Sequence, residues 1–531
     1  MKLYKAFATV GGLTMVSRLL GFVRDILIAA ALGSGAVADA FFVAFRFPNL
    51  FRRLFGEGAF NAAFVPLFAK RLEGDGREAA RSFAQEAMAG LLLVLVVVSA
   101  VAMLGMPWLM AILAPGFIAD PEKYDLAVRL TQIAFPYLTC MSLVALLSGV
   151  LNSLHRFWAA AAAPILLNVV LIGSIALAIA LGYAQRPEAG YVLAFGVLIA
   201  GLAQLAMLWV AVKNAGLGMA LVRPRWSDGM KRLVALGVPG LVSGGITQIN
   251  IVVGTIIASL QAGAVSYLYY ADRLYQLPLG IVGVAVGVVL LPDLARHLRA
   301  GNRAAAMDSQ NRSLEFALML TVPAAVALSV AAEPIIRVLF ERGAFTPADT
   351  PRTAAALTAF ALGLPAFVLI KVFQPAFFAR EDTRTPMYFA AVNMAVNVVG
   401  SIGLFFLFQH LGLMPHVGIA LATSLAGWVN AALLLMALLK HGDFDADRRL
   451  KRNVPLIVFA SVAMGIVVYA SLVLAAPYFQ PSAASLPRLG ALAGVVLLGA
   501  LVYGGLVVLT GILSPSQMKR FSRRDRAGTS G

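Results

Sequence analysis

Long apolar stretches, separated by short polar connections, follow one another along almost the whole chain. Fourteen of them have about the roughly 20 residues that a helix needs to cross the hydrocarbon core of a bilayer. The predicted spans are residues 7–31, 38–68, 86–113, 126–153, 158–182, 190–212, 233–259, 265–295, 313–338, 353–379, 387–408, 417–439, 453–476 and 486–512. An all-α protein that crosses a membrane many times is therefore expected.

Basic residues fall in alternate connections between these stretches. The termini and every second connection hold 28 of the 42 Lys and Arg residues, whereas the other connections hold 5. Because cytoplasmic connections carry the excess of Lys and Arg, both termini are expected in the cytoplasm. Topology and contact with anionic lipids account for most of the net charge of +17, without a nucleic acid partner.

The two halves of the chain repeat each other at an offset of about 227 residues. Three pairs of segments share this spacing within two residues: 33–51 with 261–279, 66–72 with 292–298, and 168–177 with 395–404. Each repeat holds six spans in the same orientation, which is typical of transporters whose two lobes enclose a site near the bilayer midplane. The expected domains are 1–225 (spans one to six), 226–450 (spans seven to twelve), 451–514 (spans thirteen and fourteen) and a basic cytoplasmic tail over 515–531.

Composition supports a membrane protein and narrows its chemistry. The chain is 60% hydrophobic and 13% charged, with a mean hydropathy of +0.86, which lies outside the range of soluble domains. Its one cysteine, Cys140, excludes a disulfide framework and a thiolate metal cluster. The sequence has no phosphate-binding loop for ATP, and its five histidines lack the spacing of metal ligands. Neither catalysis nor a metal or cofactor site is expected.

Charged side chains nevertheless occur inside the predicted spans. The basic residues that lie away from the ends of the spans are Arg18, Arg24, Arg46, Arg52, Arg53, Arg273 and Lys371. The acidic residues are Asp25, Asp39, Glu57 and Asp272. Each costs about 2.5 kcal/mol or more at membrane depth, so each is expected to face a partner or a water-filled cavity. Structural ion pairs between helices are one explanation, but pairing leaves three positive charges over. That surplus favours an anion-binding cavity, and the fixed fork of guanidinium donors suits phosphate.

The spacing of these charges predicts which side chains share a helix face. In SRLLGFVRD (17–25), Arg18 and Asp25 lie close enough on one polar face for partial pairing, with Gly21 leaving room between them. Pro48 is expected to kink or restart the second span, after which Arg53 and Glu57 lie one turn apart.

Span eight places two further pairs one turn apart. Arg273 is one turn from Tyr269, and Asp272 is one turn from Gln276. Lys371 is a lone ammonium in span ten, either part of the cavity or a lysine that reaches the interface along its own stem.

Five segments together resemble one known family. They are SRLLGFVRD (17–25), the stretch 38–66, YADRLYQLP (270–278), VLFERGAF (338–345) and KVFQPAFFAREDTRTP (371–386). The chain resembles the MurJ (MviN-like) family of lipid II flippases, within the multidrug/oligosaccharidyl-lipid/polysaccharide exporter superfamily. The resemblance implies two six-helix lobes around a central cavity, and two extra C-terminal helices that form a groove for the polyprenyl tail.

The resemblance also implies roles for particular residues. Arg18, Arg24, Asp39, Arg52, Arg53 and Arg273 are expected to line the cavity and bind substrate, with Arg18, Arg24 and Arg273 on the diphosphate. The expected gating or ion-pair residues are Asp25, Glu57, Asp272 and Lys371. Gln276 stands where some members carry a carboxylate, and the seventh helix lacks the acidic residue with which some members bind sodium. The resemblance therefore assigns no coupling ion.

The implied activity is translocation of the peptidoglycan precursor lipid II from the cytoplasmic to the periplasmic leaflet of the bacterial inner membrane by alternating access. The implied partners are lipid II, membrane lipids and peptidoglycan synthases. Other functions remain open at this point: an O-antigen-type polysaccharide flippase, a drug exporter of the same fold, a membrane-embedded polyprenyl-phosphate enzyme, or a scaffold. The arginine surplus opposes a cationic drug, and the lack of clustered acidic ligands disfavours the enzyme.

Overall fold

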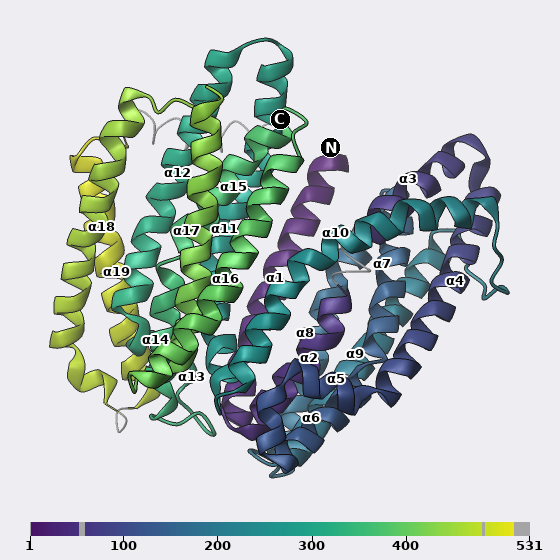
Figure 1. Ribbon diagram of the computed structural model, residues 1–531, viewed down its shortest axis with the longest axis horizontal. Coiled ribbons are helices and arrows are strands. Elements are labelled where there is room, and N and C mark those ends of the chain that lie inside the picture. The colour runs from purple at the N-terminus through teal and green to yellow at the C-terminus, as the bar shows by residue number, and fades with distance from the viewer. Residues whose placement is uncertain (1, 53–58, 481–483, 514–531) are drawn as a thin grey trace. The chain divides into compact units, whose positions relative to one another are not determined.

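The computed structural model describes residues 2–52, 59–480 and 484–513, and these residues form helices joined by short connections (Figure 1). No strand occurs within these ranges. Ten of the described segments are long and apolar enough to cross a membrane. They are Gly76–Leu104, Pro121–Ser153, Trp158–Ala180, Pro187–Asn214, Arg303–Val330, Asp349–Phe378, Arg384–His410, Pro415–Lys440, Arg448–Leu474 and Ser485–Leu509. The prediction of an all-α, multi-pass membrane protein is confirmed.

Helices also lie at the four remaining predicted spans, which include most of the charged residues named above as lying inside spans. They are α1 (Lys2–Leu32), α2 (Ala36–Arg52) with α3 (Ala59–Gly74), α10 (Asp228–Ser259) and α11 (Ala264–Arg299). The total of fourteen spans stays a prediction.

Contacts between Cα atoms divide the chain into two compact units. Unit 1 comprises Met1–Ser266 with Arg342–Thr346, and unit 2 comprises Tyr267–Glu341 with Pro347–Gly531. Besides α1, α2, α3 and α10, unit 1 contains α4 (Gly76–Leu104), α5 (Met106–Leu113), η2 (Pro115–Ala119), α6 (Pro121–Ala134), α7 (Tyr137–Ser153), α8 (Trp158–Ala180) and α9 (Pro187–Asn214). Within it, α1 packs along α8, α2 packs on α6 and α9, and α10 packs on α3 (Figure 1).

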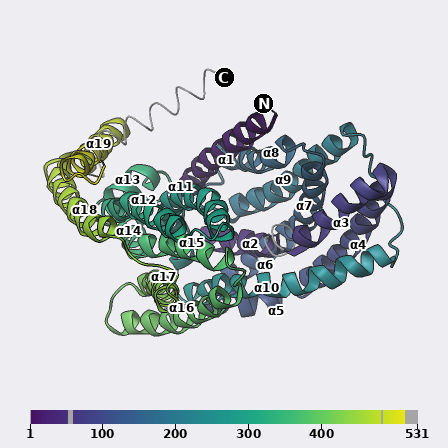
Figure 2. The same cartoon turned by 90° about the horizontal axis from the view of Figure 1, so that it is seen from above.

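Unit 2 begins within α11 and contains the remaining helices. These are α12 (Arg303–Val330), α13 (Ala332–Phe340), α14 (Asp349–Ala361), α15 (Leu364–Phe378), α16 (Arg384–His410), α17 (Pro415–Lys440), α18 (Arg448–Leu474), η3 (Ala476–Phe479) and α19 (Ser485–Leu509). α18 packs on α12 and α19, as the view from above shows (Figure 2). The hydrophobic core of unit 2 includes Leu314, Phe373 and Leu434. A smaller buried cluster contains Met464 on α18 and Val495 on α19.

The internal repeat is visible in the order and length of the helices. The lengths of α4 to α9 are 29, 8, 14, 17, 23 and 28 residues, and those of α12 to α17 are 28, 9, 13, 15, 27 and 26 residues. Pro136 precedes α7 and Gly363 precedes α15, at positions that the 227-residue offset superposes. Both residues are poor helix formers, so each repeat breaks one span at the same place.

The compact units do not coincide with the predicted domain boundary at residue 225. The repeat assigns α10 to the second half, whereas its packing places α10 in unit 1. The sequence boundary follows the duplication, and the structural boundary follows which helices pack together in this conformation. The division into 1–225, 226–450, 451–514 and 515–531 stays a prediction.

One cytoplasmic connection, by the predicted topology, begins α16 with a capping carboxylate. The Asp382 Oδ1 atom accepts hydrogen bonds from the backbone N–H groups of Arg384 and Thr385, both at 3.0 Å. A hydrogen bond from the Thr385 side chain, followed by its backbone N–H, holds the pKa of the Asp382 carboxyl below its usual value. A charged cap of this kind satisfies backbone donors that the first turn of a helix leaves unpaired.

Candidate functional site

A buried charge cluster joins α1 to α8 inside unit 1. The Arg24 guanidinium donates to the Asp25 Oδ1 atom through Nε at 3.0 Å and Nη2 at 2.7 Å. Its Nη1 atom donates to the Asn168 Oδ1 atom at 2.9 Å. Arg24, Asp25 and Asn168 are 6%, 2% and 5% exposed. We call these three residues the Arg24 cluster.

Asn168 orients the Arg24 cluster from the neighbouring helix. Its Nδ2 atom donates to the backbone carbonyl of Ser17 at 2.9 Å, which fixes the amide so that its oxygen faces Arg24. A Cβ atom added to Gly21 would lie 3.5 Å from the Asn168 amide nitrogen, an ordinary contact distance, so Asn168 lies directly beside Gly21 without requiring a glycine there. The room predicted beside Gly21 is therefore occupied by a neighbouring helix.

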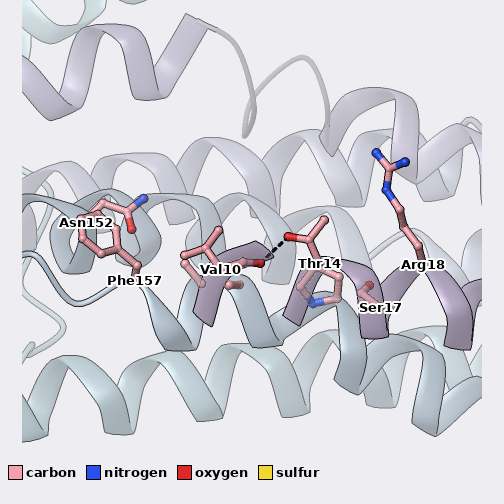
Figure 3. A pocket seen from close by; sticks show the side chains of 9 residues that line it. Val10, Thr14, Ser17, Arg18, Asn152 and Phe157 are labelled. Atoms are coloured by element: carbon pink, nitrogen blue, oxygen red, sulfur yellow. Dashed lines mark hydrogen bonds between the residues drawn. The ribbon is translucent and has the colours of Figure 1, made fainter. Parts of the chain in front are cut away.

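The predicted pairing of Arg18 with Asp25 is wrong in this structure, because Asp25 pairs with its neighbour Arg24 instead. Arg18 is exposed and lies at the rim of a pocket of about 360 Å³ (Figure 3). Within the described part of the chain, its guanidinium makes no hydrogen bond or ion pair. Of the two arginines of α1, Arg18 is thus accessible and Arg24 is buried.

Asp39 is buried, although the resemblance implied a substrate contact. Its side chain is 0% exposed and forms an ion pair with the Lys123 Nζ atom at 2.7 Å. The carboxylate also accepts the Gly263 N–H at 2.9 Å, the Ser266 N–H at 3.0 Å and the Ser266 hydroxyl at 2.7 Å. These four bonds hold α2 to α6 and to the first turn of α11, all within unit 1. In this conformation Asp39 is fully buried and paired within unit 1, and the substrate contact that the resemblance implied stays a prediction.

The remaining cations of the second span have different environments. The Arg46 Nη1 atom donates to the Thr255 hydroxyl on α10 at 2.8 Å, which ties α2 to α10 within unit 1. Arg52 ends α2, but its side chain lies outside the described residues, as do Arg53 and Glu57 entirely. Their expected roles stay predictions. α2 continues past Pro48 to Arg52, so the helix does not restart at Pro48, and the kink stays a prediction.

The pairs predicted one turn apart on span eight are confirmed in unit 2. The Arg273 Nη2 atom donates to the Tyr269 hydroxyl at 3.0 Å, and its guanidinium carbon lies 4.7 Å from the centre of the Tyr269 ring. Gln276 donates to the Asp272 carboxylate, which gives this amide a pairing role. Arg273 is only partly buried, so Tyr269 holds its guanidinium in place while the residue remains partly accessible.

Lys371 on α15 is exposed and lies against a glycine of α11. A Cβ atom at Gly283 would come within 2.6 Å of the Lys371 Cδ atom, so the stem of the lysine passes directly over this glycine. Among the described residues its ammonium group forms no ion pair. Gly283 therefore leaves room for the stem of Lys371, and the gating role expected for Lys371 stays a prediction.

Three residues that bind the charged side chains described above were not predicted from the sequence. Asn168 was only part of a repeated segment, Lys123 was counted among the residues of a connection, and Thr255 lies in an apolar span. A polar amide inside the apolar run 158–182 was the available signal for Asn168, because such a group needs a partner at membrane depth. Lys123 had no comparable signal, since its partner lies 84 residues away.

The matching family model and the curated relatives agree on one family. A family model described as "Lipid II flippase MurJ" matches residues 28–490. A "Probable lipid II flippase MurJ" from Rhizobium meliloti (strain 1021) is 49% identical over 531 residues, covering 100% of this chain and 98% of the relative. A "Lipid II flippase MurJ" from Burkholderia cenocepacia is 34% identical over 520 residues, covering 96% and 98% of the two chains.

Solved structures agree with this grouping. "Lipid II flippase MurJ, inward closed conformation" superposes with a TM-score of 0.76 at 27% identity, covering 94% of this chain and 97% of that one. An inward-facing multidrug resistance MATE family transporter of the MOP superfamily gives a TM-score of 0.64 at 14% identity, covering 82% and 98%, and supports the fold alone. By the extent of the family match and the identity to full-length relatives, the chain belongs to the MurJ family of lipid II flippases.

Proposed function

We propose that this protein moves lipid II from the cytoplasmic to the periplasmic leaflet of the bacterial inner membrane by alternating access. The observation that carries the proposal is the pair of arginines on α1, with Arg18 accessible and Arg24 buried and oriented by Asp25 and Asn168. Family membership indicates lipid II as the substrate, and the two arginines are suited to bind its diphosphate. Both termini would be cytoplasmic.

The diphosphate would be bound by Arg18, Arg24, Arg52, Arg53 and Arg273. Guanidinium groups bind phosphate oxygens through two parallel hydrogen bonds and stay charged at any physiological pH. Asp25 and Asn168 would hold Arg24 in its orientation, and Glu57, Asp272 and Lys371 would adjust the charge of the cavity as it opens and closes. The undecaprenyl tail would stay in the membrane, against α18 and α19.

The membrane potential would assist the anionic headgroup. Each elementary charge that crosses the full field is worth about 2.3 kcal/mol per 100 mV. With the cytoplasm negative, outward movement of a diphosphate is downhill, and the emptied cationic cavity would be drawn back toward the cytoplasmic side. Flipping in vesicles at an unchanged rate after the potential is collapsed would remove this part of the proposal.

A drug exporter of the same fold is the main alternative function. Such a transporter binds cations, and a cavity rich in arginine repels them, so the charge of α1 favours a lipid diphosphate. The same charge also suits a polysaccharide flippase, which uses the same kind of diphosphate. The protein would act as a transporter and not as an enzyme, with peptidoglycan synthases as candidate partners.

Reconstituted flipping of fluorescent lipid II tests the proposal. Arg24→Ala is expected to lower the flipping rate at least about tenfold, because losing charge-assisted hydrogen bonds to the diphosphate costs roughly 1.5–3 kcal/mol. Arg24→Lys is expected to lower it as well, since lysine keeps the charge but loses the fork. Arg129→Ala, on α6 in the same unit, is the control and should flip at the wild-type rate.

Two outcomes would contradict the proposal. Wild-type flipping by Arg24→Ala would remove the site assignment. Wild-type protein that leaves lipid II in one leaflet, or that flips an undecaprenyl-linked O-antigen unit at the same rate, would remove the substrate assignment.

A further inference from the structure

A pocket in unit 1 is lined by α1, by the end of α7 and by the first turns of α8 (Figure 3). Its walls are Val10, Thr14, Ser17 and Arg18 on α1, Asn152 on α7, Phe157 just before α8, and Ala160, Ala161 and Pro164 on α8. Its volume of about 360 Å³ falls within the roughly 300–1,000 Å³ of small-molecule sites. The diphosphate contacts proposed above use only Arg18 from this set.

The polar groups of the pocket have unused hydrogen-bonding capacity. The Thr14 hydroxyl donates to the Val10 carbonyl at 2.8 Å, which leaves its acceptor positions open. In the described ranges 2–52, 59–480 and 484–513, the side chains of Ser17, Arg18 and Asn152 form no hydrogen bond. Guanidinium only donates, whereas an amide and a hydroxyl both donate and accept. The pocket therefore offers hydrogen-bond donors and acceptors together, next to the permanent positive charge of Arg18.

The apolar part of the pocket adds a flat surface. The Phe157 ring is partly buried and packs edge-on against His155, with centroids 6.2 Å apart. Ala160, Ala161 and Pro164 continue this side with small or rigid groups. A phosphate group has no apolar face to match such a wall, whereas a sugar ring has hydroxyl and amide groups at its edge and C–H groups on its face.

The positions of the two arginines on α1 indicate which part of the substrate lies nearest to the pocket. Arg18 and Arg24 are six residues apart, or about 9 Å along the helix axis. A diphosphate bound along this stretch places the sugar bonded to it at one end, and the pocket extends from Arg18 away from the Arg24 cluster. The diphosphate is bonded on one side to the polyprenyl tail, which in the proposed function stays in the membrane, and on the other side to a sugar, so this sugar is the part of the headgroup nearest to the diphosphate.

We propose that this pocket binds the sugar bonded directly to the diphosphate, with Arg18 at the sugar–phosphate junction and Asn152 and Phe157 on the sugar. The inference rests on the proposed function and adds to it a specificity site: Asn152 and Phe157 distinguish a glycosylated lipid diphosphate from a bare one.

Equilibrium binding of two lipids to the purified full-length protein in detergent tests this inference. The probes are lipid II and undecaprenyl diphosphate without sugar. Asn152→Leu replaces the amide by an apolar group with the same number of heavy atoms. It is expected to weaken lipid II binding about tenfold, the effect of one or two lost hydrogen bonds, and to leave undecaprenyl diphosphate binding unchanged. Phe157→Leu is expected to act in the same direction. Asn214→Leu, an exposed amide at the end of α9 in the same unit, should change neither affinity.

The outcomes separate the two proposals. If wild-type protein fails to bind lipid II, the proposed function fails and the inference fails with it. If wild type binds lipid II but Asn152→Leu and Phe157→Leu weaken both lipids equally, or weaken neither, the sugar site alone is overturned. Retained binding of undecaprenyl diphosphate shows that a variant is folded, and the second variant decides the matter if the first loses its fold.

Discussion

Replacing Lys123 with methionine tests whether Asp39 is structural or binds substrate. Methionine keeps most of the length of the side chain but removes the ammonium that lies 2.7 Å from the Asp39 carboxylate. The lysine and aspartate side chains are 7% and 0% exposed, so water does not replace the lost partner. The carboxylate keeps only its bonds from Gly263 and Ser266.

The expected loss of stability is about 3–5 kcal/mol, the cost of leaving one buried charge of a pair uncompensated. Asp39→Asn is expected to cost a similar amount, since it leaves the ammonium buried beside a neutral amide. In the double variant neither charge remains. It should therefore lose less stability than the sum of the two single variants, by about 1–3 kcal/mol for residues in direct contact.

Denaturant unfolding in detergent, followed by tryptophan fluorescence, measures these differences. Lys231→Met is the matched control, because Lys231 also pairs with an aspartate, Asp228 at 3.0 Å, but is 56% exposed. An exposed pair contributes at most about 1 kcal/mol. The reasoning is refuted if Lys123→Met unfolds at the same denaturant concentration as Lys231→Met, or if the double variant loses the full sum. Substrate binding would then be the better account of Asp39.

Three further predictions follow from other contacts. Asn168→Leu should cost about 1–3 kcal/mol in unfolding free energy by leaving buried Arg24 without its amide partner, and should slow lipid II flipping; wild-type flipping would show that Asn168 does not orient Arg24. Gly33→Ala should destabilise unit 1 by more than the roughly 1–2 kcal/mol of a left-handed backbone, because Gly33 has a φ of +66° and its Cβ would lie 2.4 Å from the Ala344 carbonyl oxygen; Gly35→Ala, with nothing within 4 Å, should be silent in the same unfolding assay. Asp382→Ala should lower stability above the ordinary carboxyl pKa of about 3.9, where the cap is charged in both folded and unfolded chains, and the difference from wild type should vanish as the pH falls through the lowered folded pKa; a pH-independent difference would contradict the charged cap.

Much of the fold could be predicted from the sequence because of a simple constraint. A chain segment in hydrocarbon must satisfy all its backbone hydrogen bonds internally, so an apolar run of sufficient length is a helix. The positions of the long helices and the order of the two repeats follow from this, and α4 to α9 and α12 to α17 confirm the repeat. The grouping of α10 with unit 1 could not be predicted, because packing between distant helices leaves no periodic signal in either of them.

The candidate site was predictable in part for the same reason. Pairs on one helix follow from its 3.6-residue period, and the contacts of Arg273 with Tyr269 and of Asp272 with Gln276 are confirmed. The helix period could not predict whether Arg18 or Arg24 pairs with Asp25. The pairing depends on Asn168, which reaches Arg24 from a different helix.

The sequence by itself determined that this chain is a multi-pass membrane protein with two similar halves, that it carries more cations than anions at membrane depth, and to which family it belongs. These properties depend on residue type and spacing, which are local. Only the tertiary structure decided which charge lies buried and which stays accessible: Arg24 is held by Asp25 and Asn168, Asp39 is closed off by Lys123, and Arg18 is left at a pocket. The physical reason is that the cost of a buried charge depends on the partners that other helices bring to it, and residues far apart in the chain supply those partners.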